Sequence, residues 1–471
     1  MSLPAYIRTG VVLALLTGLA ACSPPDDSSP GDGDADSDAD TDNDTDTDAD
    51  TDGEPDAPGW NPVRVRGTVW SPGADLEGTR ENNRFPIPGA AVIAYTSRPA
   101  DLPQERYCNE CVEVPTGNPN TMSHAVDGTF ELELLPGRTY YLTVQKGEFR
   151  RVREYVAPDR PGEVVEIESI EGSPRPALTT LPSRTDLAAG DNIPKIAMIR
   201  GSYENMRPMF SALGFDYEQD GVDFEIYCAP DPILHSCPGS GVPTLLDDPA
   251  VLDQYNMIII SCGQDWPGRN AERAENLREW VRNGGRLYVD DFNYEFVEQP
   301  WPEFLSWFVE SPGSEGGSTG ECGTSGNPSG GTHGCNNWSS YNFNGAASDE
   351  PDFAAWLSLP QVNRGAPLVL QAAWDYIFET GEGLIGVDEE TGEEVHRAPR
   401  VWMYNEDSVP FGGRHVPATV SWPFFCGRVL YTVYHTHGSG EGPTYELLLQ
   451  EKIMMYLIME VQTCTTDPGL I

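Results

Sequence analysis

Basic side chains are scarce in this chain. Its 471 residues include 29 lysines and arginines against 74 aspartates and glutamates, which gives a formal net charge of −45 at pH 7. Such a chain repels a phosphate backbone, because nucleic-acid affinity depends on lysine and arginine. The composition therefore excludes nucleic acid as an expected partner.

Long apolar runs and peptidase-type zinc motifs are missing as well. The longest mostly apolar stretch covers residues 10–21, which is too short to cross a hydrocarbon layer of about 30 Å as a helix. The run at residues 453–459 is flanked by Lys452 and Glu460 and predicts a buried helix. No HxxE motif occurs anywhere in the sequence.

The N-terminus has the features of an export signal. Arg8 precedes the apolar core, and the sequence LAAC at residues 19–22 resembles the lipobox of bacterial lipoproteins. The resemblance implies that Cys22 is lipidated and becomes the mature N-terminus, anchored by about 0.8 kcal/mol per buried CH₂. Ser23 at the second mature position favours the outer membrane or the cell surface. The alternative is an ordinary secretory signal peptide that ends in cysteine.

An acidic segment follows the lipobox. Residues 26–57 hold 15 acidic and no basic side chains, with aspartate alternating with small residues. This composition offers nothing apolar to bury and predicts an acidic, disordered tether over residues 23–58. The pattern DADTDG at residues 48–53 looks like the opening of an EF-hand, but Gly59 stands where the bidentate glutamate is needed. We expect no EF-hand and, at most, weak Ca²⁺ binding.

Short runs with a period of two residues begin at residue 63. Apolar and polar side chains alternate over residues 63–69 and 130–134, as in strands with one buried face. Further strands are expected at residues 89–95, 140–144 and 163–167. This spacing predicts a β-sandwich over residues 59–170.

Three segments of this region resemble one family. They are PIPGAAVIAY (residues 86–95), VDGTFELELLPG (126–137) and RTYYLTVQKG (138–147). They resemble the carboxypeptidase regulatory-like domain, a transthyretin-like sandwich. The resemblance implies an accessory module, because the peptidase domain with its zinc ligands performs hydrolysis in those enzymes.

The pattern changes again after a predicted linker at residues 171–192. Apolar strands are expected at residues 194–200, 223–227, 255–261 and 286–290, with helices at 204–213, 270–283 and 445–461. Asn270 is the expected N-cap of the second helix. Alternating strands and helices predict an α/β domain over residues 193–464 with a parallel sheet covered on both faces. A Gly/Ser-rich insert is expected at residues 311–347.

Three segments here resemble the glutamine-amidotransferase-like fold, which is flavodoxin-like. They are YNMIIISCG (residues 255–263), LREWVRNGGRLYVDDFNYEF (277–296) and GRVLYTVYHTHG (427–438). Catalytic members of the family carry a nucleophilic cysteine on a sharp elbow and a later His-x-Glu. Here Asp290 and Asp291 stand at the elbow, His435 matches the family histidine, and His437 replaces the glutamate. The departures predict that acyl transfer is absent.

The residues at these strand ends are the candidate ligand-binding site. Asp290, Asp291, His435 and His437 are expected at the carboxyl edge of the sheet, where α/β proteins bind ligands. They suit a hard cation such as Ca²⁺ or the hydroxyl groups of a ligand, and helix capping is the alternative for the aspartates. Cys262 is either a core thiol or a nucleophile with His435 as its base.

The export signal places the cysteines in an oxidising compartment, which favours disulfides. Proximity in sequence and strand geometry predict four pairs: Cys108–Cys111, Cys228–Cys237, Cys322–Cys335 and Cys426–Cys464. Cys262 is the expected unpaired thiol. For Cys108 and Cys111, half of a zinc knuckle is the alternative.

Five tryptophans lie in the second half of the chain: Trp301, Trp307, Trp338, Trp356 and Trp374. They either pack in the core or form a sugar-stacking surface. Together these features predict a cell-envelope lipoprotein that is a noncatalytic binding or structural module without a cofactor. Its expected partners are the membrane, through the anchor, and an envelope glycan or protein. The alternative is an envelope hydrolase that acts on glycan or peptide.

Overall fold

The structure is a computed structural model. It describes residues 61–109, 114–216, 223–228, 240–263, 270–307, 341–348, 350–374, 376–407, 415–436 and 445–463. The chain divides into two units, residues 1–59 and 60–471, and every described residue belongs to the second. The predicted signal, the lipidation site Cys22 and the acidic tether therefore lie outside the described residues.

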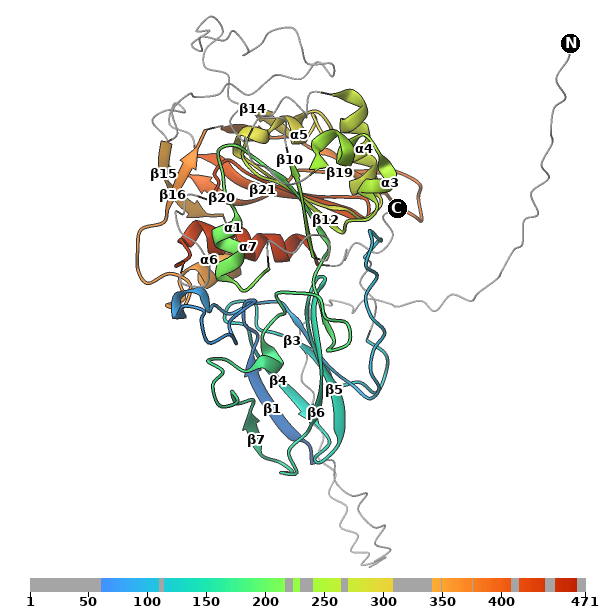
Figure 1. The fold of residues 1–471 in the computed structure, drawn as a ribbon, viewed down its shortest axis with the longest axis vertical. Helices are drawn as coiled ribbons and strands as arrows, with labels where there is room; N and C mark the ends of the chain where they lie inside the picture. The colour runs from blue at the N-terminus through green and yellow to red at the C-terminus, as the bar shows by residue number, and fades with distance from the viewer. Residues whose placement is uncertain are drawn as a thin grey trace, which may run out of the picture. The chain divides into compact units, whose positions relative to one another are not determined.

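Two sheets form the first part of the described chain (Figure 1). One has the strand order β4-β1-β7, and the other the order β3-β2-β5-β6-β8. Val63 and Val65 of β1 and Phe130 and Leu132 of β4 are buried, as their period-two pattern predicts. The strands are β1 (Val63–Thr68), β2 (Ala91–Tyr95), β3 (Asn120–Met122), β4 (Thr129–Leu134), β5 (Thr139–Lys146), β6 (Phe149–Val156), β7 (Val164–Glu166) and β8 (Asp191–Asn192).

The segment predicted as a linker takes part in this structure. It contains the 3₁₀ helix η2 (Ala177–Thr179) and the strand β8, which pairs with β6. A further 3₁₀ helix, η1 (Glu81–Asn83), lies in the loop after β1. The chain between the predicted domains thus extends a sheet of the first part.

A ten-stranded sheet organises the rest of the chain, in the order β11-β10-β9-β12-β13-β22-β21-β20-β15-β16. The pairs from β11 to β22 are parallel, and the pairs from β22 to β16 are antiparallel. The prediction of a parallel sheet is therefore correct for its first half and wrong for its second. The strands are β9 (Ile196–Arg200), β10 (Phe224–Cys228), β11 (Ser240–Gly241), β12 (Met257–Ile260), β13 (Arg286–Asp290), β15 (Tyr341–Ala347), β16 (Val369–Ala373), β20 (Arg400–Asn405), β21 (Val416–Phe424) and β22 (Gly427–Thr432).

Helices lie on both sides of this sheet, with α4 and α5 on one side and α1 and α7 on the other (Figure 1). The Asn270 side chain accepts a hydrogen bond from the backbone N–H of Arg273, which confirms the predicted N-cap of α4. The helices are α1 (Arg207–Ala212), α2 (Val242–Leu246), α3 (Pro249–Leu252), α4 (Ala271–Arg282), α5 (Glu295–Glu298), α6 (Pro351–Leu357) and α7 (Leu449–Val461). Two small sheets pair β14 (Leu305–Trp307) with β17 (Ile377–Thr380) and β18 (Gly383–Val387) with β19 (Glu394–Arg397).

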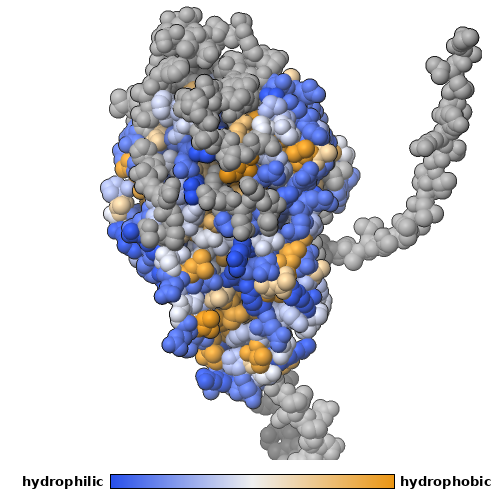
Figure 2. All heavy atoms as spheres, viewed as in Figure 1, coloured by the Kyte–Doolittle hydropathy of each residue, from blue (hydrophilic) through white to orange (hydrophobic). Residues whose placement is uncertain are grey.

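The apolar run at residues 453–459 is buried within α7, as predicted. Among the described residues, no helix combines the length and the hydropathy that a membrane crossing requires. Hydrophilic residues dominate the face in view in Figure 2, and apolar residues appear there in small separate groups.

The loop between β2 and β3 lies against the amino edge of the parallel strands, the edge at which those strands begin. Arg106 donates from its backbone N–H to the carbonyl of Asp253 (3.1 Å) and from Nη1 to the carbonyl of Asn283 (2.5 Å). Asn256, just before β12, donates from Nδ2 to the carbonyl of Glu105 (2.9 Å). The loop therefore reaches the starts of β12 and β13.

A disulfide completes this contact and corrects two predicted pairs. Cys108 bonds to Cys426, 318 residues away, with Cα atoms 5.1 Å apart. The pairs Cys108–Cys111 and Cys426–Cys464 are therefore wrong. Cys426 lies in the turn before β22, and the loop after β2 brings Cys108 to it, a long-range contact that proximity in sequence does not reveal.

The other cysteine predictions fall partly outside the described residues. Cys262 is free and buried, as predicted. Cys228 is disulfide-bonded, and its predicted partner Cys237 lies outside the described residues, as do Cys111, Cys322, Cys335 and Cys464.

Candidate functional site

The candidate site lies at the carboxyl edge of the parallel strands, where β9, β12, β13 and β22 end. The loops after β9 and β12 approach closely, and a Cβ on Gly201 would stand 1.8 Å from the carbonyl oxygen of Cys262. Tyr203 donates from its backbone N–H to the same oxygen (3.1 Å). Glycine is required at this crossing, because any side chain would separate the two loops.

Asp291 follows β13 with a φ of 43°, a left-handed conformation that is uncommon outside glycine. The 3₁₀ helix η4 (Asp291–Asn293) begins at the same residue. A strand, a strained turn and a 3₁₀ helix follow one another here, as in the elbow that carries the nucleophile in α/β-hydrolases. A carboxylate therefore occupies the elbow position, as the sequence predicts.

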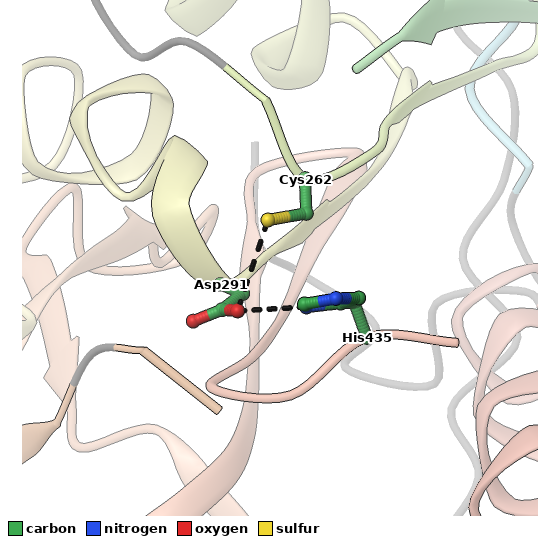
Figure 3. A group of neighbouring side chains, drawn as sticks. All are labelled: Cys262, Asp291 and His435. Atoms are coloured by element: carbon green, nitrogen blue, oxygen red, sulfur yellow. Dashed lines mark hydrogen bonds and ion pairs between the residues drawn. The ribbon is translucent and has the colours of Figure 1, made fainter. Parts of the chain in front are cut away.

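Three groups surround the buried Asp291 carboxylate, and Figure 3 draws two of them, Cys262 and His435. His435 Nδ1 lies 2.7 Å from Oδ2, and Cys262 Sγ lies 3.7 Å from the same oxygen. The backbone N–H of Trp374 donates to Oδ1 (2.8 Å). With Asp291 accepting, His435 carries its proton on Nδ1. The carboxylate thus lies between the thiol and the imidazole.

Glu204 holds two of the loops that carry these residues. Its Oε2 accepts a hydrogen bond from the backbone N–H of Cys262 (3.1 Å), and its Oε1 accepts one from the backbone N–H of Thr436 (2.6 Å). From α7, Gln450 Nε2 donates to the carbonyl of His435 (2.6 Å). One buried carboxylate therefore fixes the positions of Cys262 and of the residue that follows His435.

Asp290 adds a further buried acid. It is completely buried, and its carboxyl group lies against the carboxylate of Glu204 and the hydroxyl of Tyr288. Burial, followed by the negative charge of Glu204, raises the pKa of Asp290 well above its ordinary value. The site therefore concentrates three acidic side chains, Glu204, Asp290 and Asp291, around one histidine.

These charges also control the thiol and the imidazole. Burial raises the pKa of the Cys262 thiol well above its ordinary value, and the charges of Asp291, Asp290 and Glu204 raise it further. Burial opposes protonation of His435, but the hydrogen bond to Asp291 and the nearby negative charges outweigh it and raise the pKa of the imidazole. A thiol nucleophile needs a lowered pKa. The environment of Cys262 therefore opposes thiolate formation.

Three aromatic rings lie beside this polar cluster. Tyr203 is 46% exposed, and its ring stacks on that of Trp374 with centroids 6.3 Å apart. The Phe292 ring meets Tyr203 edge to face, with centroids 5.8 Å apart. We call Tyr203, Phe292 and Trp374 the aromatic group. It flanks the Asp291–His435 pair, because Phe292 follows Asp291 and the Trp374 backbone binds it.

The structure brings together most of the predicted site. Asp291 and His435 are in direct contact, Asp290 lies beside them, and His437 lies outside the described residues. Glu204 was missed, because its position at the start of an apolar segment resembled an ordinary helix terminus. Trp374 reaches the site because Ala373 pairs with Tyr434 in an isolated bridge, which no local pattern predicts.

The predicted tryptophans were expected either in the core or at a sugar-stacking surface, and the structure contains examples of both positions. Trp301, Trp307 and Trp356 are buried in the hydrophobic core, as the packing interpretation predicts. Trp374 is only partly buried and belongs to the aromatic group, and Trp338 lies outside the described residues. Trp374 is thus the one described member of the predicted set that borders the site.

Comparisons with known proteins show only distant similarity. No family model matches the chain, and no curated protein matches it. A solved structure described as a putative ThuA-like protein from Bacteroides uniformis is 11% identical, with a TM-score of 0.29, over 58% of this chain and 93% of that one. A cytoplasmic protein from Salmonella typhimurium is 11% identical, with a TM-score of 0.29, over 57% of this chain and 98% of that one.

A third similar structure belongs to a longer chain. The GH42 β-galactosidase Gan42B is 12% identical, with a TM-score of 0.28, over 59% of this chain and 31% of that one. This chain therefore spans about a third of that enzyme. At such TM-scores the similarity does not establish a shared fold.

Proposed function

We propose that the chain is a cell-envelope lipoprotein whose folded part binds a ligand at the carboxyl edge of the α/β sheet without catalysing a reaction. The lipobox at residues 19–22 supports lipid attachment at Cys22 and a location at the outer membrane or cell surface. The acidic composition of residues 23–58 supports a tether between the anchor and the folded part. The membrane is thus the first partner, through the lipid.

The finer fold assignment belongs to the same proposal. The sheets β4-β1-β7 and β3-β2-β5-β6-β8 are compatible with a carboxypeptidase regulatory-like sandwich. In chain order, β9, β10, β12, β13 and β22 occupy the sheet in the order 2-1-3-4-5, the order of flavodoxin-like sheets. In such sheets ligands bind where the order reverses, here between β9 and β12. Glu204 and Cys262 follow these two strands.

The aromatic group beside the Asp291–His435 pair is the observation that carries the binding proposal. A partly exposed ring next to fixed polar groups suits a ligand with an apolar ring face and hydroxyl groups. Sugars have both. We therefore propose an envelope glycan as the ligand, in keeping with the excess of acid over base that disfavours polyanions.

The test is a binding titration with soluble envelope oligosaccharides, followed by tryptophan fluorescence and calorimetry. We expect Trp374→Ala and Tyr203→Ala to weaken binding at least tenfold. Tyr141→Ala, on the sandwich strand β5, is the matched control and should bind as the wild type does. Equal affinity in all four proteins, or binding of an envelope protein in place of glycan, would reject the glycan site.

The anchor is tested separately. Intact-mass analysis of membrane-extracted protein should give a chain that begins at Cys22 and carries acyl mass. Cys22→Ala should abolish the acyl mass and leave the uncleaved precursor. An unmodified, soluble mature chain would show that the signal is an ordinary secretory one.

A second candidate function, an envelope hydrolase, is favoured by the left-handed backbone at Asp291. Asp291 would be the nucleophile and His435 the base. Turnover of glycan or peptide that disappears in Asp291→Asn would establish it. A hydrolase with Cys262 as its nucleophile would require a reactive thiolate. Rapid labelling of Cys262 by an electrophilic probe that depends on His435 would show such a thiolate, and the protein would then be a cysteine enzyme.

A further inference from the structure

Three different metal-ligand types meet in the candidate site. The sulfur of Cys262, one carboxylate oxygen of Asp291 and a ring nitrogen of His435 all lie within 4.8 Å of one another, and all three residues are buried (Figure 3). They come from the ends of β12, β13 and β22, three neighbouring strands of one sheet. Their relative positions are therefore set by the backbone of the sheet.

We propose that Cys262, Asp291 and His435 bind one divalent transition-metal ion of the zinc class. A thiolate, an imidazole and a carboxylate form the ligand set of such ions, whereas Ca²⁺ and Mg²⁺ take oxygen ligands alone. The ligand set differs from that of the hard cation, such as Ca²⁺, that the sequence allowed as one possibility for Asp290 and Asp291. The proposal is independent of the glycan proposal.

The observed distances are close to those of a tetrahedral zinc site. With Zn–S of about 2.3 Å and Zn–N and Zn–O of about 2.0 Å, neighbouring ligand atoms are separated by about 3.5 Å for S and O and by about 3.3 Å for N and O. The observed separations are 3.7 Å from Cys262 Sγ to Asp291 Oδ2 and 2.7 Å from His435 Nδ1 to the same oxygen. A small widening of the Asp291–His435 contact would admit the ion in place of the shared proton.

The groups behind the ligands are arranged as metal sites require. The second carboxylate oxygen of Asp291 accepts the Trp374 N–H, and Glu204 fixes the backbone of Cys262 and of Thr436. Such outer contacts hold first ligands in place. Glu204 is therefore a positioning residue, not a ligand.

The negative charge of the site also favours a bound cation. Glu204 and Asp290 are buried beside Asp291, and neither forms an ion pair with a lysine or arginine among the described residues. Glu204 accepts hydrogen bonds from backbone N–H groups, and Asp290 lies against the acids Glu204 and Asp291. Burying several acids together is unfavourable, and a divalent cation would compensate the negative charge of those that are ionised. Three protein ligands also leave one tetrahedral position for water or for an oxygen of a bound ligand.

The experiment uses the intact chain, without an affinity tag, in detergent. After dialysis against a chelator, it is titrated with Co²⁺. We expect one equivalent to bind, with a sulfur-to-cobalt absorption band in the near ultraviolet, and Zn²⁺ to displace it. An excess of Ca²⁺ should have no effect. Binding releases the thiol proton, which a weakly buffered solution reports.

The variants assign the ligands. Cys262→Ser should abolish the near-ultraviolet band, and His435→Gln should weaken Co²⁺ binding at least tenfold. Glu204→Gln should weaken it about tenfold to a hundredfold while the band remains, as expected for a positioning residue. His396→Gln is the matched control, because His396 pairs with Glu394 on the exposed strand β19, and it should bind as the wild type does.

Two results would overturn the proposal. The first is an absorption band that persists in Cys262→Ser, because the sulfur ligand would then come from another cysteine. The second is the absence of stoichiometric Co²⁺ binding by the wild type. Thermal unfolding shows whether the variants are folded. Zn²⁺ should raise the Tm of the wild type and of His396→Gln but not that of Cys262→Ser, whose metal-free Tm should stay close to the wild type. Glycan titrations with and without chelator then show whether glycan affinity depends on the metal.

Discussion

The two edges of the parallel strands differ in what their residues contribute. At the amino edge, the loop after β2 is tied to the starts of β12, β13 and β22 by hydrogen bonds and by the Cys108–Cys426 disulfide. At the carboxyl edge, Asp291 has a left-handed backbone, and Asp290 is a completely buried acid beside the carboxylate of Glu204. The first set of features stabilises the fold, and the second costs stability.

This difference teaches where function resides. Strained backbone and clustered buried acids persist where a site needs them. Removing the disulfide or the hydrogen bonds at the amino edge should therefore lower stability and leave binding intact. Changes at Asp290 or Asp291 should weaken binding and need not lower the stability of the metal-free protein.

The largest effect is expected from removing the disulfide. Cys108→Ser with Cys426→Ser opens a loop of 318 residues and should lower the free energy of unfolding by about 4 kcal/mol. Urea unfolding followed by fluorescence measures the loss. Co²⁺ binding under native conditions should be unchanged, and a parallel loss of metal affinity would show that the two edges are not separable.

A pH-dependent effect of about 3 kcal/mol at pH 7 is expected from Glu148, near the amino edge. Burial raises the pKa of Glu148 to about 8, and the charge of Arg286 only partly offsets this. Because the folded pKa lies above the unfolded value of 4.5, the penalty is absent below that value and grows as the pH rises to about 8.

The substitution Glu148→Gln isolates this penalty. Its stability should equal that of the wild type near pH 4.5 and exceed it near pH 8. Urea midpoints measured across this range provide the test. A variant that is less stable than the wild type at the upper pH would mean that Glu148 is paired as a carboxylate.

A smaller effect of opposite sign is expected at the carboxyl edge. Burial and the neighbouring acids raise the pKa of Asp290, so its presence costs stability once the pH rises above the ordinary pKa of the carboxyl group. Asp290→Asn should therefore stabilise the metal-free protein by about 1 kcal/mol near neutral pH and have no effect near pH 4. Thermal unfolding in the presence of a chelator measures it, with Asp159→Asn, an exposed acid in the loop after β6, as the control. Destabilisation by Asp290→Asn would contradict the view that this edge costs stability.

Sequence reasoning succeeded where the signal is local. Asn270 caps α4 because its side chain reaches the N–H three residues on, and Asp291 and His435 meet because neighbouring parallel strands end at one edge. The period-two pattern likewise located β1 and β4. The cap and the two strands follow from the chain within a few residues, whereas the Asp291–His435 contact follows from the strand ends, although the two residues are 144 positions apart.

The remainder depends on contacts that local patterns do not encode. Cys108 finds Cys426 only through the path of a loop from the sandwich, and Trp374 reaches Asp291 only through the bridge of Ala373 to Tyr434. The antiparallel half of the sheet was missed because β20, β21 and β22 follow one another in the chain and pair as antiparallel neighbours, whereas the prediction extended the alternation of strands and helices seen in the first half. Glu204 acts through its tertiary partners, which its place at a helix start conceals.

The disulfide also has a consequence for how the protein matures. Cys108 precedes Cys426 by 318 residues and is therefore synthesised long before it, while Cys111 is the next cysteine along the chain. The native bond can close only after residue 426 has been made, and an early bond to Cys111 would have to be exchanged. Once closed, the bond joins the segment that carries Cys108 to the segment that carries Cys426. A single cut between the two cysteines would leave the two pieces covalently attached until a reductant reached them.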